Sequence, residues 1–295
     1  MAMVRLKELD NRFEADVWSD VLTQEGIAFR IRSYMDTAYD GLFVSQKGYA
    51  TLFVEEEDLP RAQALEREMA AGQDAALSEA GELARALEHT LLDPEAGVSE
   101  LAAHLAQCRE LGVVGACVSP WMVSQAAQVL EGSGILVVSV VGFPLGTATG
   151  RAKLQEALDL AREGAHELDL VLNRGLVRSG RLDQAVAEVA EVAAAVAPRP
   201  LKVILETSRL GPDLTRLVAA ALAESGAAFL KTGSGYFGAA TPADVALLRE
   251  AAPELPVKAA GGIRDLAGAR ALLEAGATRL GSSAGAAILA QAREA

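Results

Sequence analysis

The feature that most constrains this chain is a regular alternation of short apolar runs and amphipathic helical stretches, from about residue 77 to its end. Helical stretches with apolar residues three or four positions apart separate successive runs, and glycines stand where the helices should end. Such alternation predicts an α/β fold with a parallel sheet. Eight runs are expected to be strands, near 87–91, 114–118, 135–141, 166–172, 201–206, 227–231, 256–260 and 278–281.

Two architectures accommodate eight strands that alternate with helices. One is a closed (β/α)₈ barrel, and the other is an open, doubly wound sheet. Polar residues recur at the C-terminal ends of many different strands in this sequence, and in a barrel those ends converge on one mouth. We therefore predict a barrel over residues 77–295, and we keep the open sheet as the alternative.

The first 72 residues differ from the rest of the chain in composition and in predicted element order. They contain many of the aromatic residues, and their predicted order is β-α-β-β-β-α. A helix from Phe13 to Leu22 is expected to end at Gly26, and Asp58 can cap a final helix. The strands are expected at 4–6, 27–31, 42–44 and 49–54, the last two as a hairpin. We predict a small α+β module over 1–72, with residues 70–76 as a linker. Its pattern resembles a small bacterial domain family described as signal-transducing, and its role is left open.

Composition excludes several classes of protein. The 295-residue chain carries a net charge of −13, whereas nucleic-acid binding and membrane-surface binding both need basic patches. Its two cysteines form no disulfide framework, no apolar run could span a bilayer, and no signal peptide is visible, so a cytoplasmic location is expected. The three histidines lack metal-ligand spacing, and we predict no metal.

Charged residues interrupt several of the predicted strands. Asp169 lies within an apolar strand, with Glu167 assigned to the opposite face, and Lys202 lies within Leu-Lys-Val-Ile-Leu. A charge inside a barrel is costly unless it is paired, so these residues predict an ion-pair network. Glu206, on the same strand face as Lys202, and Glu88, on the first strand, are the expected partners of that lysine.

The stretch from Phe229 to Gly238 delivers Lys231 from a strand end into a loop with three glycines. A lone lysine at such a position usually extends its amine to water. A second lysine, Lys258, lies one predicted strand later, near the same end. A neighbouring cation and partial burial favour the uncharged, nucleophilic amine, so the pair suggests a covalent mechanism. Ion pairs that only fix barrel register are the structural alternative.

Eight segments in order resemble the deoxyribose-phosphate aldolase family. They are Leu-Glu-His-Thr-Leu-Leu from 87, Ala-Cys-Val-Ser-Pro from 116, Val-Val-Gly-Phe-Pro-Leu-Gly from 140, Glu-Leu-Asp-Leu-Val-Leu-Asn from 167, Leu-Lys-Val-Ile-Leu-Glu-Thr from 201, Phe-Leu-Lys-Thr from 229, Val-Lys-Ala-Ala-Gly-Gly-Ile-Arg from 257 and Leu-Gly-Ser-Ser from 280. The resemblance implies a metal-independent class I aldolase on a TIM barrel, without a cofactor. It implies cleavage of 2-deoxy-D-ribose 5-phosphate to acetaldehyde and D-glyceraldehyde 3-phosphate.

The resemblance also implies residue roles. Lys231 matches the lysine that forms the Schiff base, Lys258 matches the second lysine that favours its neutral form, and Asp169 matches an acid in proton relay. A phosphate site is expected where glycines bring backbone N–H groups near an anion, after the seventh and eighth strands. Its members would be Gly235, Gly262, Gly281, Ser282 and Ser283, with Lys202, Glu206 and Glu88 as a supporting polar network.

Several positions depart from the family pattern. Glu88 stands in place of an aspartate, Gly233 and Tyr236 alter the loop after Lys231, and Ala284 replaces a serine. A class I aldolase for another aldehyde or sugar phosphate is therefore a second hypothesis, and a catalytically retired regulatory barrel is a third. The expected partner is a small phosphorylated sugar, with no nucleic acid or membrane, and the barrel is expected to form a homodimer.

Overall fold

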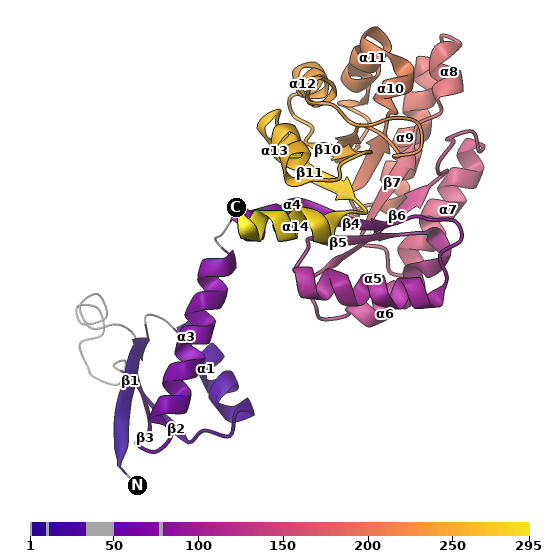
Figure 1. Ribbon diagram of the computed structural model, residues 1–295. Helices are drawn as coiled ribbons and strands as arrows, with labels where there is room; N and C mark the ends of the chain where they lie inside the picture. The colour runs from indigo at the N-terminus through magenta and orange to yellow at the C-terminus, as the bar shows by residue number, and fades with distance from the viewer. Residues whose placement is uncertain (1, 10–11, 34–49, 77–78) are drawn as a thin grey trace, which may run out of the picture. The chain divides into compact units, whose positions relative to one another are not determined.

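The computed structural model describes residues 2–9, 12–33, 50–76 and 79–295, and it divides the chain into two compact units, Met1–Leu77 and Ser78–Ala295 (Figure 1). Each unit has its own hydrophobic core. The boundary falls between a helix of the first unit and a helix that packs onto the barrel.

The N-terminal unit is a three-stranded antiparallel sheet with strand order β1-β3-β2, covered by helices. Trp18 and Leu22 on one helix pack with Leu9, Leu52 and Val54 of the sheet, and all five are buried. The elements are β1 (Met3–Leu9), α1 (Arg12–Gln24), β2 (Phe29–Ser33), β3 (Ala50–Glu55) and α3 (Leu59–Ala76). The expected hairpin strand at 42–44 lies outside the described residues.

Residues 70–76 do not form the predicted linker, because helix α3 continues to Ala76. Four of these seven residues are alanine, the residue with the highest helix propensity, and the single glycine at 72 costs only about 1 kcal/mol. The small-residue composition that suggested a linker is therefore also suited to a helix.

The C-terminal unit is a closed barrel of eight parallel strands, in which neighbours along the chain are also neighbours in the barrel. The open-sheet alternative is wrong, because β11 pairs with β4 and closes the ring. The strands are β4 (Leu87–Leu91), β5 (Gly115–Val118), β6 (Leu136–Val141), β7 (Glu167–Val171), β8 (Leu201–Ile204), β9 (Phe229–Lys231), β10 (Val257–Ala260) and β11 (Ala277–Ser282).

Helices surround the barrel and bury their apolar faces against the outer side of the strands (Figure 1). They are α4 (Glu79–Ala86), α5 (Val98–Leu111), η1 (Pro120–Met122), α6 (Val123–Leu130), α7 (Gly150–Arg162), α8 (Arg174–Arg178), α9 (Leu182–Val196), α10 (Thr207–Leu210), α11 (Pro212–Leu222), α12 (Pro242–Ala251), α13 (Leu266–Glu274) and α14 (Gly285–Glu294). None of the helices in the described ranges is both long and apolar enough to cross a membrane.

Two glycines at helix ends provide a matched test of packing around the barrel. Gly112, after α5, and Gly164, after α7, both have positive φ, at +63° and +106°. A Cβ on Gly112 would meet nothing within 4 Å, whereas one on Gly164 would lie 2.7 Å from the Cβ of Ala127 on α6. Both positions thus carry backbone strain for alanine, but only one also carries a steric clash.

We expect Gly112→Ala to lower the free energy of unfolding by about 1–2 kcal/mol, the cost of a left-handed alanine. Gly164→Ala should lower it by a further 1–3 kcal/mol, because α6 and α7 must separate. Urea unfolding followed by circular dichroism measures both. Equal losses in the two variants would contradict the close packing of α6 against the end of α7.

Candidate active site

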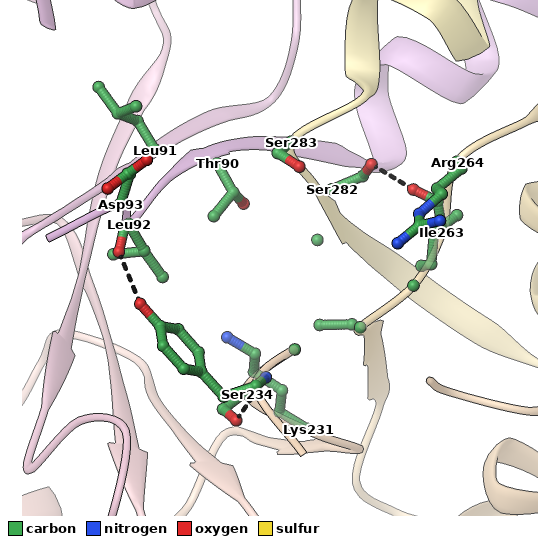
Figure 2. A pocket seen from close by; sticks show the side chains of 16 residues that line it. Thr90, Leu91, Leu92, Asp93, Lys231, Ser234, Ile263, Arg264, Ser282 and Ser283 are labelled. Atoms are coloured by element: carbon green, nitrogen blue, oxygen red, sulfur yellow. Dashed lines mark hydrogen bonds between the residues drawn. The ribbon is translucent and has the colours of Figure 1, made fainter. Parts of the chain in front are cut away.

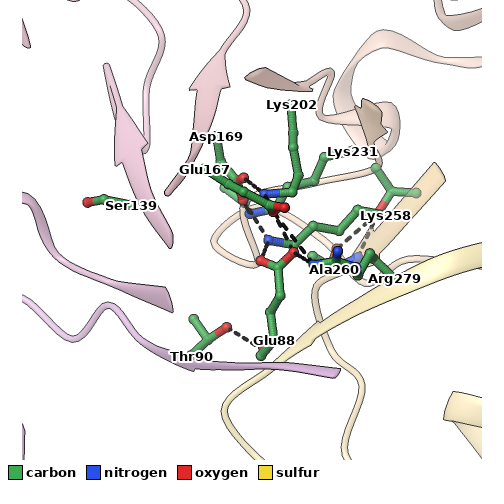
Figure 3. Close-up of polar contacts among 12 residues, drawn as sticks. Glu88, Thr90, Ser139, Glu167, Asp169, Lys202, Lys231, Lys258, Ala260 and Arg279 are labelled. Atoms are coloured by element: carbon green, nitrogen blue, oxygen red, sulfur yellow. Dashed lines mark hydrogen bonds and ion pairs between the residues drawn. The ribbon is translucent and has the colours of Figure 1, made fainter. Parts of the chain in front are cut away.

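An ion-pair cluster occupies the interior of the barrel, and its residues come from β4, β7, β8, β9, β10 and β11 (Figure 3). Asp169 is at its centre and is fully buried. Its Oδ1 accepts a hydrogen bond from Lys202 Nζ at 2.9 Å, and its Oδ2 accepts from Lys231 Nζ and Lys258 Nζ, each at 2.7 Å. One carboxylate thus contacts all three lysines that the sequence placed inside the barrel.

Strand register explains why these side chains meet. Asp169 pairs in register with Lys202 on the next strand, and Lys231 pairs with Lys258. In a parallel barrel, residues at the same level on neighbouring strands project to the same side, so their side chains converge on the axis. The close spacing of two ammonium groups is tolerable because a carboxylate lies between them.

Glu88 provides the second internal carboxylate. It is fully buried on β4 and forms a short ion pair with Lys258, and it also lies 3.5 Å from Lys202 Nζ and 3.3 Å from Arg279. The predicted contact between Glu88 and Lys202 is present. The longer glutamate side chain, in place of the family's aspartate, extends to Lys258 and contacts it directly.

Two expectations for this network are wrong. Glu206 does not pair with Lys202, because β8 ends at Ile204 and Glu206 turns out of the strand with φ +61°. Its Oε2 instead accepts a hydrogen bond from Ser234 N at 3.0 Å and holds the glycine loop. Glu167 faces the interior with Asp169, because residues two apart on a strand share a face. Its Oε2 lies 2.6 Å from Lys202 Nζ, an ion pair without well-aligned hydrogen-bond geometry.

Burial and opposite charge act against each other throughout the cluster. Burial alone would raise the pKa of Asp169, but Lys202, Lys231 and Lys258 outweigh it and hold that pKa well below its usual range. The pKa of Glu88 is also lowered, since Lys202 and Lys258 outweigh its burial. Burial would lower the pKa of Lys258, yet Asp169 and Glu88 raise it well above normal. Lys258 therefore remains a buried cation at neutral pH.

A pocket of about 470 Å³ opens at the C-terminal ends of β4, β9, β10 and β11, above this cluster (Figure 2). Lys231 lines it and is 3% exposed, whereas Lys202 and Lys258 lie beneath it and are fully buried. Among the described lysines, Lys231 alone borders this pocket. The pocket thus has a single primary amine at its base.

The predicted phosphate residues all line this pocket, which brings together Gly235, Gly262, Gly281, Ser282 and Ser283. Their roles differ, however. The Ser282 hydroxyl donates to Ile263 O at 2.7 Å and accepts from Ala284 N, so it fixes the turn into α14. Ser283 is exposed toward the pocket, as Figure 2 shows. Gly261 cannot carry a Cβ, which would lie 2.7 Å from Gly238 O.

Four residues belong to the pocket or the ion-pair cluster although the sequence analysis did not place them there: Arg264, Tyr236, Glu167 and Arg279. Arg264 lines the pocket beyond the two glycines that follow β10, and a cation after Gly-Gly at a strand end could have suggested it. The Tyr236 hydroxyl donates to Leu92 O at 3.1 Å, and its ring meets Phe143 edge-on, so it spans the pocket mouth. Nothing local in the sequence indicates that long-range contact.

The histidines and cysteines lie outside the pocket lining. His89 and His104 stack with ring centroids 4.7 Å apart, and His89 also contacts Gln107 at 2.7 Å. In the described part of the chain, no three His, Cys, Asp or Glu side chains form a group suited to a metal ion. Both cysteines are buried and free.

The fold and this pocket define a class of protein, a β/α barrel with a buried lysine amine at the base of a pocket at the C-terminal ends of its strands. No family profile matches the chain. A deoxyribose-phosphate aldolase from Microcystis aeruginosa is 40% identical over 215 residues, which cover 72% of this chain and 95% of that protein. A deoxyribose-phosphate aldolase from Streptococcus pneumoniae is 42% identical over 206 residues, which cover 69% of this chain and 93% of that protein.

Two solved structures similar to this chain are aldolases as well. A tetrameric deoxyribose phosphate aldolase from Aeropyrum pernix matches with a TM-score of 0.69 and 29% identity, covering 75% of this chain and 95% of that one. The structure of an aldolase called QR15 matches with a TM-score of 0.69 and 33% identity, and the match covers 72% of this chain and 96% of that one. This chain belongs to the deoxyribose-phosphate aldolase family. The predicted family and the predicted barrel are both confirmed.

His104 provides a test of the electrostatics beside the barrel. Burial, with a smaller contribution from His89, lowers the pKa of His104 to about 4. An unfolded histidine has a pKa of about 6.5, so between these values the unfolded chain binds more protons than the folded chain. Stability from this group is therefore complete above pH 6.5 and is lost as pH falls toward 4.

We expect His104→Gln to remove up to about 3 kcal/mol of the stability difference between pH 7 and pH 4, by the usual conversion of a pKa shift. The measurement is urea unfolding of the unmodified protein and of the His104→Gln variant across this pH range. The comparison isolates His104, since the carboxylates of the barrel titrate in both chains. Parallel pH profiles would show that His104 has the same pKa in the folded and unfolded protein, which would contradict the lowered value.

Proposed function

We propose that the chain cleaves 2-deoxy-D-ribose 5-phosphate to acetaldehyde and D-glyceraldehyde 3-phosphate through a Schiff base on Lys231. The observation that carries this proposal is the position of Lys231, whose amine lies at the base of the pocket while it contacts the same carboxylate oxygen as Lys258. The pocket supplies the access that a covalent nucleophile needs, and the cluster supplies its charge environment.

The number of carboxylate contacts supports Lys231 as the nucleophile. Lys202 lies within ion-pair distance of three carboxylates, and Lys258 contacts two. Among the described carboxylates, Lys231 pairs with Asp169 alone, which it shares with Lys258. Among the three amines, Lys231 therefore has the fewest carboxylate partners, and it is the one that reaches the pocket.

The proposed reaction starts when Lys231 Nζ attacks C1 of the open-chain sugar and water leaves to form an iminium ion. Loss of the proton from the C3 hydroxyl then breaks the C2–C3 bond, its electrons flow into the iminium, and glyceraldehyde 3-phosphate departs. Protonation of the resulting enamine at C2 and hydrolysis release acetaldehyde and free Lys231. Asp169 starts as a carboxylate, takes up the proton released by the amine or by the C3 hydroxyl, returns a proton at a later step, and so ends as a carboxylate.

The phosphate of the substrate is proposed to bind at the opposite wall of the pocket. Backbone N–H groups near Gly235, Gly262 and Ser283 can approach an anion closely, because no side chain intervenes at the glycines. The exposed guanidinium of Arg264 adds a charge-assisted contact. The altered loop around Gly233 and Tyr236 leaves this wall in place, which favours the sugar phosphate over the alternative aldehydes.

We also infer a cytoplasmic location, because the substrate is a phosphorylated intracellular sugar and the two buried thiols suit a reducing compartment. The expected homodimer remains a prediction. The Aeropyrum pernix protein is described as tetrameric.

Treatment with acetaldehyde and borohydride should add one ethyl group to Lys231, because reduction traps its imine. Peptide mapping by mass spectrometry locates the label. In Lys258→Leu the label should stay on Lys231 but form about 100- to 1,000-fold more slowly, since Asp169 is then free to hold the Lys231 ammonium. Lys231→Leu should abolish labelling.

Lys153 provides the control for this experiment. It is a fully buried lysine outside the cluster, paired with Glu188 at 2.5 Å, and it should stay unlabelled throughout. A label on Lys202 or Lys258 with Lys231 untouched would assign the nucleophile elsewhere. Absence of any label in a folded, active protein would exclude an imine mechanism.

The phosphate should raise kcat/KM by at least about 100-fold, measured as deoxyribose 5-phosphate against unphosphorylated deoxyribose. Arg264→Leu should reduce that ratio about tenfold through KM, because a charge-assisted contact to the phosphate is lost. Arg293→Leu, an exposed arginine on α14, is the charge-matched control. A ratio near one in the unmodified chain would favour an aldolase for unphosphorylated aldehydes.

A further inference from the structure

Three arginines gather beyond the catalytic pocket, at the ends of β7 and β8. Arg174 and Arg178 are the first and last residues of α8, and Arg209 lies in α10. The guanidinium carbons of Arg174 and Arg209 lie 5.3 and 5.5 Å from the ring centroid of Phe237, and Arg178 donates a short hydrogen bond to Arg209 O. We call Arg174, Arg178, Arg209 and Phe237 the arginine cluster.

The arginine cluster lacks the anionic partners that such groups usually have. None of its three guanidinium groups forms an ion pair with a carboxylate in the part of the chain that the structure describes, although the protein carries a net charge of −13. Arg174 Nη1 is buried from solvent, and it has no hydrogen-bond partner among the residues that the structure describes. Burial lowers the pKa of Arg174, and repulsion from Arg209 and Arg178 adds to this effect.

Glu206 is the carboxylate that acts electrostatically on Arg174, and it is already engaged. Its Oε2 accepts the N–H of Ser234, in the loop that lines the catalytic pocket. Three guanidinium charges against this one carboxylate leave an excess of about two positive charges. A phosphate monoester carries nearly two negative charges at neutral pH, and guanidinium groups bind phosphate oxygens in pairs.

We propose that the arginine cluster is a second binding site, for a phosphate monoester or inorganic phosphate, distinct from the catalytic pocket. None of the four residues of the cluster lines that pocket, so the ligand would bind beside the substrate rather than as the substrate. The site adjoins the loop after Lys231 on two sides, through Phe237 and through the hydrogen bond from Ser234 to Glu206. Occupancy of the cluster would therefore stabilise this loop.

Isothermal titration of the full-length protein with inorganic phosphate tests the proposal. We expect two equivalents per chain, one in the catalytic pocket and one at the cluster. The double variant Arg174→Gln, Arg209→Gln should retain only one equivalent, with at least a tenfold loss of affinity at the other. Arg264→Leu should weaken the remaining equivalent instead, and Arg293→Leu should change neither.

Arg178→Gln distinguishes a loss of phosphate binding from a loss of folding. Arg178 is exposed, and the arginines that stack on the Phe237 ring are Arg174 and Arg209. This variant should weaken the second equivalent several-fold while circular dichroism and melting temperature stay unchanged. Titration with glycerol 3-phosphate then separates the two ligand sources, since tighter binding at the cluster identifies a phosphate monoester. A single equivalent in the unmodified chain, abolished by Arg264→Leu and insensitive to the cluster variants, would overturn the proposal.

Discussion

The structure depends on one carboxylate, Asp169, which contacts three lysines at once inside the barrel. Taking four charges out of water is expensive, and apolar residues of similar volume would often stabilise a core as well. The cluster is therefore better explained by chemistry than by stability. It links β7 to β8, β9 and β10, and it keeps the Lys231 amine at the base of the pocket within 2.7 Å of a proton acceptor.

The mouth of the barrel is built largely from backbone and small residues. Gly261 must be glycine because a Cβ would collide with Gly238 O, and the close approach of these two segments forms one wall of the pocket. The opposite wall is formed by side chains, where Tyr236 reaches across to Leu92 O. This division suits a substrate with a charged phosphate at one end and a reactive carbonyl at the other.

Charge is distributed unevenly over the molecule. The chain as a whole is strongly acidic, yet the barrel interior and the pocket lining each carry a small excess of cations, four against three carboxylates inside and Lys231 and Arg264 against Asp93 in the pocket. Clefts lined by one sign of charge concentrate ligands of the opposite sign. A small excess of cations at the pocket thus favours a small anionic ligand, whereas nucleic acids need an extended basic surface.

The sequence by itself determined the barrel, because strand–helix alternation and glycine punctuation are local signals and each appears in the structure. It also identified Lys231 and Lys258 as neighbours, since strand ends in a barrel must converge, whereas the pocket glycines were expected from the family resemblance. Ion-pair partners were decided by the tertiary structure. Strand β8 ends at Ile204, two residues before Glu206, and Glu206 therefore accepts a hydrogen bond from Ser234 N instead of facing the barrel interior. Arg279, near the C-terminus, pairs with Glu88 on the first barrel strand. Such contacts depend on where β8 ends and how the barrel closes, and short-range sequence patterns carry no information about either.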